Sequence, residues 1–412
     1  MRLSSHYLYD SSVANLQKRQ ENLATSQEQL TSGKRVVYAS DDPTAAARAE
    51  RALAAIARTD ANQRTLDASR NVMNIAESAM GNAVDLLQTA RETMVAAGNG
   101  SYSDGERKAL AIKLRDIRNQ LLTVANRPDG GGGYVFGGQG SSSPPFVETT
   151  TGVSFRGQSG ESLASTGERL NLSVDGELIW LKGRSSANGV FNTAQGTNVL
   201  TSGPNTGTGW ISAGEVETPA DLPYPASPSP TYAINFTVSG STITYDVLED
   251  GAAIATGQPY SSGKEISIPG RGMSVAISGS PANGDSFTIG EARNDLNIFG
   301  ALDDTIASLE ATNQRGGQVQ QAVNTGMARV DAALTSLLGA RAEVGEQLNR
   351  MEGIESRNAD LKLAAKTEKS NAEDLDMVDA ISNFQNQQTG YQAALQSYAS
   401  IQKLSLFQYI NG

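Results

Sequence analysis

The stretch Leu66–Ala97, LDASRNVMNIAESAMGNAVDLLQTARETMVAA, decides the fold, because large apolar side chains recur in it every seven residues. These large residues are Leu66, Met73, Met80, Leu87 and Met94. A small residue follows each of them three positions later, namely Ser69, Ala76, Ala83, Ala90 and Ala97. A seam that alternates large and small residues lets helices approach closely, with the side chains of one fitting between those of the next. The stretch therefore predicts a long helix in a bundle.

Helical patterns lie on both sides of this stretch. Before it, Leu16, Leu23 and Leu30 repeat every seven residues up to a break at Gly33 and Asp41-Asp42-Pro43. After it, Ser103 to Glu106 has the pattern of a capping box, in which side chain and backbone bond reciprocally at a helix start. The next helix carries apolar residues at 4,3,4,3 spacing: Leu110, Leu114, Ile117, Leu121 and Val124. Pro128 and the four glycines 130–133 end it.

The C-terminal arm mirrors the first. One seam alternates by four and three residues through Val323, Met327, Val330, Leu334, Leu337, Arg341, Val344, Leu348 and Met351, and only the arginine interrupts it. A second seam runs through Met377, Ile381, Phe384, Gln388, Tyr391, Leu395 and Tyr398. Residues 1–129 carry 17 basic and 15 acidic groups, whereas residues 291–412 carry 10 and 16. The opposite charge balance favours pairing of the two arms, although exposed ion pairs add only about 0–1 kcal/mol each.

The middle of the chain has a different composition. Residues 130–290 hold 28 of the 42 glycines, 11 of the 13 prolines and both tryptophans. Short alternating patterns such as Tyr232–Val238, Thr242–Leu248 and Glu265–Ile268 predict strands, joined by turns at Glu249-Asp250-Gly251-Ala252 and Asn283-Gly284-Asp285. The fold class is α+β: a long antiparallel helical bundle or coiled coil built from both termini, with a central β-rich inserted domain. Both chain ends then lie together.

We predict three parts. Residues 1–45 and 358–412 form terminal assembly helices, residues 46–149 and 291–357 form a helical core bundle with a β-hairpin corner, and residues 150–290 form a β-rich outer domain. The first helix, in residues 4–32, is marginal alone, because such helices gain most of their stability from packing. Paired with the last helix it leaves more apolar surface than two helices cover, which marks a binding interface. The predicted assembly interface comprises Leu16, Leu23, Leu30, Ile381, Phe384, Tyr391, Leu395, Tyr398, Leu404, Leu406 and Phe407.

Composition excludes much of enzyme chemistry. The chain of 412 residues has no cysteine and one histidine, so thiolate nucleophiles, cysteine zinc sites and multi-histidine metal sites are ruled out. A net charge of −11 argues against a dominant nucleic-acid or anionic-membrane partner. The first residues contain no apolar stretch typical of a cleavable signal peptide, and no run approaches the length of a membrane span. We expect neither enzymatic activity nor a cofactor.

Three isolated features have ordinary structural explanations. His6 has no strand-turn-helix elbow around it, so the prior probability of a catalytic role is about one in fifty. The glycines at 130–133 follow a helix and lack the GK[ST] ending of a phosphate loop, which favours a flexible corner. Asp41-Asp42-Pro43 and the acids Glu373, Asp374 and Asp376 lack calcium-loop spacing, so a solvated turn and a solvated helix start are preferred, about nine to one, over cation sites.

A resemblance to a known family rests on several segments. Residues 30–43, LTSGKRVVYASDDP, resemble the N-terminal signature of bacterial flagellin-like axial proteins, with the motif turn at Gly33, Arg35, Ser40, Asp41, Asp42 and Pro43. The opening MRLS, the segments 133–138 (GYVFGG) and 144–146 (PPF), and the ending from Tyr391-Gln392-Ala393-Ala394-Leu395 to Leu404-Ser405-Leu406-Phe407 resemble the hook-associated members more than filament flagellin. Residues 279–287, GSPANGDSF, resemble a turn of hook-associated proteins.

The resemblance implies an extracellular structural protein at the hook-filament junction of the bacterial flagellum, exported through the type III apparatus without signal cleavage. It implies self-association in a ring, with hook-associated protein 1 on the hook side and flagellin on the filament side, and an export chaperone on the C-terminal helices. Terminal helices packed against neighbouring copies would supply the repeating heterologous interface that a tube needs.

Other classes stay open. Filament flagellin is a sibling structural role, and a secreted helical adhesin or translocator is a further alternative. An enzyme with its site in the β insert is the last, but the insert holds six basic residues, thirteen scattered acids and no histidine.

Overall fold

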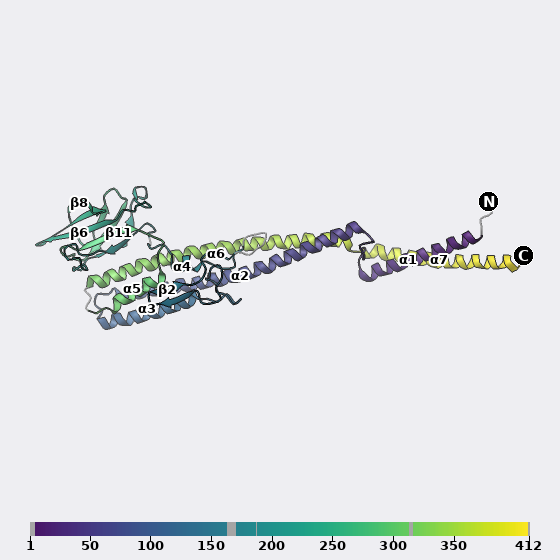
Figure 1. The fold of residues 1–412 in the computed structure, drawn as a ribbon, viewed down its shortest axis with the longest axis horizontal. Helices are drawn as coiled ribbons and strands as arrows, with labels where there is room; N and C mark the ends of the chain where they lie inside the picture. The colour runs from purple at the N-terminus through teal and green to yellow at the C-terminus, as the bar shows by residue number, and fades with distance from the viewer. Residues whose placement is uncertain (1–4, 163–169, 187, 313–315, 411–412) are drawn as a thin grey trace. The chain divides into compact units, whose positions relative to one another are not determined.

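The computed structural model describes residues 5–162, 170–186, 188–312 and 316–410. By the contacts that its residues make, the chain divides into a terminal unit, residues 1–65 with 353–412, and a central unit, residues 66–352. Helices α2 (Pro43–Ala97) and α6 (Gly316–Glu373) each run through both units. The predicted α+β class is confirmed: long helices come from both ends of the chain, and antiparallel strands lie between them in sequence (Figure 1).

The heptad pattern of α2 describes the core of the central unit. Leu66 and Met94, which begin and end the repeat, are at most 1% exposed, and so are the large and small residues between them. Helices α3 (Asp104–Ala125), α5 (Ile298–Glu310) and α6 supply the rest of the bundle. The capping box of α3 is confirmed: the Ser103 side chain accepts from the Glu106 N–H, and the Glu106 carboxylate accepts from the Ser103 N–H at 2.7 Å.

Ion pairs fix the antiparallel register of α2 and α6. Arg70 pairs with Glu352 at 3.6 Å and Arg91 pairs with Asp331 at 2.7 Å, so an advance of 21 residues on α2 matches a retreat of 21 on α6. The interruption of the predicted seam, Arg341, donates to the Glu77 carboxylate at 2.7 Å and lies over Gly81. A charged residue at a seam position is thus accommodated because α2 presents a glycine and a carboxylate there.

An aromatic cluster joins the helices to the first hairpin. Strands β1 (Phe146–Thr149) and β2 (Gly152–Phe155) form that hairpin, and the short helix α4 (Gly176–Trp180) follows. The ring of Trp180 stacks on Phe299 of α5 at 5.9 Å, and Phe136 meets the same indole edge-on at 5.6 Å. Phe136, Phe146 and Trp180 are therefore packed into the helical core around Phe299, which composition alone did not indicate.

The remaining strands form two antiparallel sheets that enclose a second hydrophobic core. The larger sheet has the order β3 (Phe191–Gln195), β11 (Ser286–Glu291), β6 (Tyr232–Ser239), β7 (Thr242–Glu249) and β8 (Ala252–Pro259). In the smaller sheet, β10 (Met273–Ser278) pairs with β4 (Trp210–Ile211), β5 (Glu215–Val216) and β9 (Glu265–Ile268). A short 3₁₀ helix, Pro219–Asp221, follows β5. Phe236 and Phe287 of the larger sheet and Val275 and Ile277 of the smaller sheet share one buried cluster.

Two antiparallel segments connect this β region to the helices. The Ser185 N–H donates to the Arg293 carbonyl at 2.8 Å, and the Ala292 N–H donates to the Val190 carbonyl at 2.9 Å. Gly183 and Leu296 form a bridge one step closer to the helices. The chain thus enters and leaves the β region at one place, which we call the neck, residues 183–186, 188–190 and 292–296.

The predicted turn at Asn283-Gly284-Asp285 holds a buried carboxylate. Asp285 is fully buried, and its two oxygens accept from the N–H groups of Thr206, Gly207 and Ala282 at 2.8–2.9 Å. The Asn198 amide donates to it as well, at 3.0 Å. Gly284 has φ +82°, and a Cβ there would meet the Asn198 side chain at 2.6 Å. Asp285 therefore ties two loops to the end of β11.

Removal of this carboxylate should destabilise the β region. Asp285→Ala removes, at a fully buried position, the acceptor of four hydrogen bonds, so we expect the free energy of unfolding to fall by about 3 kcal/mol or more. Asp285→Asn should lose nearly as much, since its NH₂ would face a donor. Asp221→Ala, an exposed site, should change stability by less than about 0.5 kcal/mol. Denaturant unfolding of the three variants checks this, and equal losses at positions 221 and 285 would contradict it.

Candidate assembly surface and linker turn

The terminal unit contains a pair of helices from opposite ends of the chain. Helix α1 (Ser5–Ser32) lies alongside α7 (Met377–Ile410) (Figure 1). The Ser26 hydroxyl donates to the Gln387 side chain at 2.8 Å across the pair, and the Arg19 guanidinium lies against Gly390. The placement of both ends together, as expected from the arms, follows from this pairing.

No residue of this pair is buried among those whose side chains are described, residues 10–32 and 377–400. Leu16, Leu23 and Leu30 face the partner helix but stay half-exposed, as do Phe384 and others of α7. Each of these apolar side chains therefore keeps part of its surface in water. The contrast with the fully buried seam of α2 is what distinguishes this pair.

The seam of α7 differs from the predicted one. Ile381 is 46% exposed and Leu395 43% exposed, while Ala380 and Ala394, one residue earlier, are half-buried. Small residues at those positions, with Gly390, let α1 come close on that side of α7. Phe384, Tyr391 and Tyr398 are half-buried, so only part of the predicted seam faces α1.

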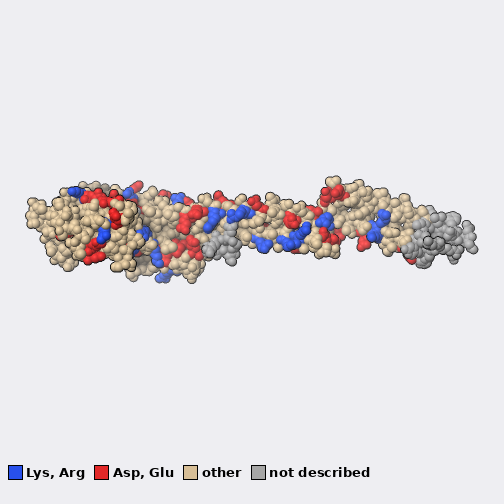
Figure 2. All heavy atoms as spheres, turned by 90° about the horizontal axis from the view of Figure 1, so that it is seen from above, with Lys and Arg blue, Asp and Glu red and all other residues tan. Residues whose placement is uncertain are grey.

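The outward stripe of α7, which includes Val378, Ile381 and Leu395, is nearly uncharged and exposes these apolar side chains. Val378 is 79% exposed, and it lies one helical turn from Ile381. Among the 34 residues of α7 only Asp379 and Lys403 are charged. Figure 2 shows few charged side chains on the stretch occupied by α1 and α7, whereas acidic and basic side chains crowd the stretch occupied by α2 and α6. A surface without charge repulsion and with exposed apolar groups is suited to association.

Three residues of the predicted interface cannot be placed. The side chains of Leu404, Leu406 and Phe407, like that of His6, lie outside the described residues. The described part of the predicted interface is therefore Leu16, Leu23, Leu30, Ile381, Phe384, Tyr391, Leu395 and Tyr398.

The motif turn, residues 33–42, ends α1 and starts α2. Gly33 has φ +68°, the left-handed conformation in which glycine ends helices without strain. Asp41 accepts from the Val37 and Tyr38 N–H groups at 3.1 and 2.8 Å, while Ser40 is exposed. Asp42 then caps α2, which begins at Pro43, so each carboxylate of the pair has its own backbone partners.

Electrostatics agree with the capping role of Asp42. Hydrogen bonds from the Ala45 N–H and then from the Thr44 hydroxyl lower the pKa of the Asp42 carboxyl from 3.8 to about 2, and Arg35 at 3.3 Å adds to the effect. The turn is solvated, as expected, and the acidic pair serves the backbone of the turn and of α2.

The turn also clasps the linker between α6 and α7. The Arg35 N–H donates to the Glu373 carbonyl at 2.7 Å, and the Leu375 N–H donates to the Gly33 carbonyl at 3.1 Å. Lys34 pairs with the Glu373 carboxylate at 3.3 Å, and Arg35 donates to the Ala372 carbonyl at 2.8 Å. The sequence analysis did not predict that Lys34 pairs with Glu373. The available signal was that the two residues carry opposite charges and lie at matching breaks of the two arms.

The acids after α6 have a structural role as well. Asp376 accepts from the Val378 and Asp379 N–H groups at 3.0 and 3.3 Å and so caps α7. Within the described residues, no group of three acidic or histidine side chains is placed to hold a metal ion. None of the described helices is long and apolar enough to span a membrane.

Both arms match known families. Residues 3–141 match the bacterial flagellin N-terminal helical region, and residues 327–410 match the bacterial flagellin C-terminal helical region. The chain is similar to flagellar hook-associated protein 3 of Salmonella typhimurium, 27% identical over 420 aligned positions that cover 99% of each chain. Flagellin E of Vibrio cholerae is 27% identical over 82% of this chain and 79% of its own.

Solved structures agree. The hook-associated protein 3 of Legionella pneumophila has a TM-score of 0.67 at 27% identity and covers 77% of this chain and 96% of its own. The FlgL protein of Xanthomonas campestris has a TM-score of 0.66 at 27% identity and covers 78% of this chain and 99% of its own.

The pKa of Asp42 makes the start of α2 sensitive to acid. A carboxyl whose pKa is depressed on folding stabilises the fold above its unfolded value near 3.8, and this stability is lost as the pH falls toward about 2. Carbon NMR titration of aspartate-labelled protein should give Asp42 a midpoint near 2. Thr44→Val should raise that midpoint, whereas Thr31→Val, in α1, should leave it unchanged. A wild-type midpoint near 3.8 would contradict the capping role.

Proposed function

Since the chain belongs to the flagellin-like axial proteins of the bacterial flagellum, we propose that it forms the junction between hook and filament and assembles through α1 and α7. It is a structural component of the flagellum that acts outside the cell in association with hook and filament components. We propose further that it has no enzymatic activity and that it leaves the cell through the type III apparatus without a cleaved signal.

The observation that carries the proposal is the outward stripe of α7. A helix pair that buries none of the side chains described in it, with Val378, Ile381 and Leu395 in water, gains its missing contacts when copies pack side by side. Burial of about 25 cal/mol per Å² of apolar surface then drives association. The assembly residues proposed are Leu16, Leu23, Leu30, Ile381, Phe384, Tyr391, Leu395, Tyr398, Leu404, Leu406 and Phe407.

We propose the specific partners that the family resemblance implies. In a ring of copies, one end would meet hook-associated protein 1 and the other end would meet flagellin. Before export the same uncharged stripe would promote aggregation, so we propose that an export chaperone covers the C-terminal helices.

The division of labour among domains is also a proposal. Residues 1–45 with 358–412 would assemble, residues 46–149 with 291–357 would form the core bundle, and residues 150–290 would face outward. The contact of Trp180 with Phe299 and the hydrogen bonds of the neck favour an outer domain that starts nearer residue 190.

The alternative is filament flagellin, whose terminal regions are shared. Similarity to hook-associated protein 3 over 99% of both chains, together with the likeness to solved structures of hook-associated protein 3 and FlgL at 27% identity, favours the junction. A helical adhesin or translocator is less well supported, because both flagellin terminal regions are present.

Electron microscopy of a deletion strain tests the junction role. Cells that lack this protein should carry hooks without filaments and release flagellin into the medium, and a plasmid copy should restore filaments. Normal filaments in the deletion strain would contradict the proposal. Hooks with attached but shortened filaments would favour the flagellin alternative.

Substitutions should separate folding from assembly. Leu121 is fully buried in α3, so Leu121→Ala should lower the free energy of unfolding by about 2–5 kcal/mol. Leu395→Asp places a charge on the outward stripe, so it should change the stability of the monomer by less than about 0.5 kcal/mol but abolish filament attachment and chaperone binding. Thermal melting and motility assays check this, and equal destabilisation by both variants would count against a separate assembly segment.

The β region should be dispensable for the junction. Its ends are joined by the Ser185–Arg293 hydrogen bond, so a short Gly/Ser linker can replace residues 186–292. We expect this variant to be exported and to hold filaments, whereas a variant without residues 391–412 should not. Loss of filaments in the replacement variant, with its helices still folded by circular dichroism, would place the junction contacts in the β region.

A further inference from the structure

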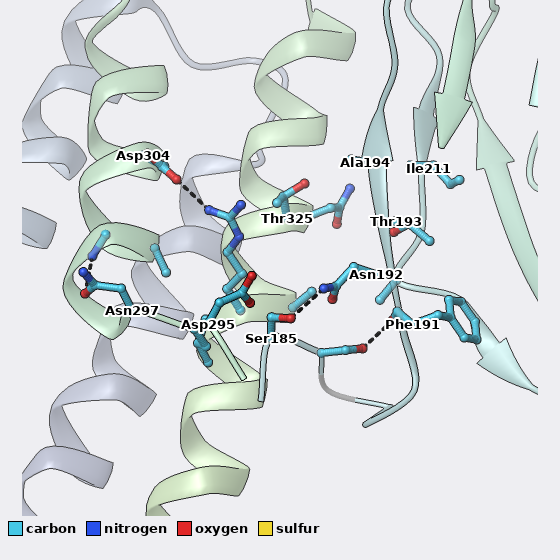
Figure 3. Close-up of a pocket in the computed structure, with 18 residues that line it drawn as sticks. Ser185, Phe191, Asn192, Thr193, Ala194, Ile211, Asp295, Asn297, Asp304 and Thr325 are labelled. Carbon is cyan, nitrogen blue, oxygen red and sulfur yellow. Dashed lines mark hydrogen bonds and ion pairs between the residues drawn. The ribbon is translucent and has the colours of Figure 1, made fainter. Parts of the chain in front are cut away.

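A polar cavity lies in the central unit between strand β3 and helices α5 and α6. It has a volume of ≈370 Å³, within the range of about 300–1,000 Å³ typical of small-molecule sites. A second hollow of ≈410 Å³ adjoins it and shares Asp304, Thr325 and Arg329 with it. Figure 3 shows side chains from the neck, from β3 and from both helices gathered around the first cavity.

Amides and hydroxyls make up a large part of the lining of both hollows. Ser185, Asn192, Thr193, Asn297 and Thr325 line the first, and glutamines take their place in the second. Such groups both donate and accept hydrogen bonds. Some of them already hold one another, as where the Asn192 amide donates to Ser185 at 2.8 Å. These hydrogen bonds fix the orientation of the side chains that line the cavity, and they leave its volume open.

Two buried donors in the wall have no partner among the described residues. The side-chain nitrogen of Asn324, on α6, lines the first cavity, and that of Gln195, on β3, lines the second. A buried donor without an acceptor costs about 1–3 kcal/mol, so native proteins rarely keep one without a reason. An occupant with oxygen acceptors would satisfy both.

The charged side chains in the lining restrict the chemical class of ligand that the cavity can bind. Among the described residues that line the two hollows, Arg329 is the single cation, and its pairing with Asp304 at 2.6 Å leaves it unavailable to a phosphate. Asp295 adds an exposed carboxylate that can accept from hydroxyl groups. We propose that the two adjoining hollows together bind a neutral polyhydroxylated small molecule, a mono- or disaccharide, whose hydroxyl oxygens accept from Asn324 in the first hollow and from Gln195 in the second, and whose O–H groups donate to Asp295.

The test uses the full-length protein with D-glucose, D-galactose, N-acetyl-D-glucosamine and maltose, observed by saturation-transfer NMR and titration calorimetry. At least one of them should bind saturably with a Kd of about 10 mM or tighter. Asn324→Ala should weaken binding roughly tenfold. Ala194→Trp, an exposed position on the rim of both hollows, should block it. Asn349→Ala, exposed on the same helix, should leave it unchanged.

Melting temperatures show whether the variants remain folded. If none of the sugars binds saturably up to about 50 mM to folded protein, the proposal is wrong and water satisfies the two amides. Binding that persists in both Asn324→Ala and Ala194→Trp would also overturn it, since the sugar would then lie elsewhere. Inorganic phosphate and putrescine serve as probes of the charged alternatives, and preference for either over the sugars would contradict a neutral ligand.

Discussion

Helices α1 and α7 pair without burying any residue whose side chain the structure describes, and this incomplete packing is the constraint on which the rest of the structure depends. The leucines of α1 face α7 yet stay half in water, whereas Met73 and Met80 of α2 are fully buried among other helices. Since helix stability comes mostly from tertiary packing, α1 and α7 are the part of the chain with most to gain from neighbouring copies. The helices of the central unit thus bury their seam within one chain, whereas α1 and α7 leave theirs partly exposed.

Within the terminal unit, the turn at residues 33–42 is hydrogen-bonded to the linker between α6 and α7. Hydrogen bonds between the turn at Gly33 and the linker at Glu373 hold the starts of α2 and α7 together even though α1 and α7 bury little. Asp42 and Asp376 each cap the helix that follows. Ordered linkers would keep the two terminal helices in register before any neighbour arrives.

Periodicity predicted the helices because their packing is local and repetitive. The seam of α2 and the cap at Ser103 could be identified from spacing alone. The outward position of Ile381 could not, because the choice between faces of α7 depends on where Gly390 lets α1 approach. The roles of Trp180 and Asp285 were also hidden, since each depends on partners more than 70 residues away in the chain.

Hydrogen exchange on the full-length protein tests the central claim most directly. In dilute monomer, amides of residues 10–30 and 378–400 should exchange rapidly while those of residues 66–97 stay protected. In assembled flagella both sets should be protected, because neighbouring copies then cover the α7 stripe. Strong protection of residues 10–30 in the dilute monomer would contradict the claim, because the terminal helices would then be stable without partners.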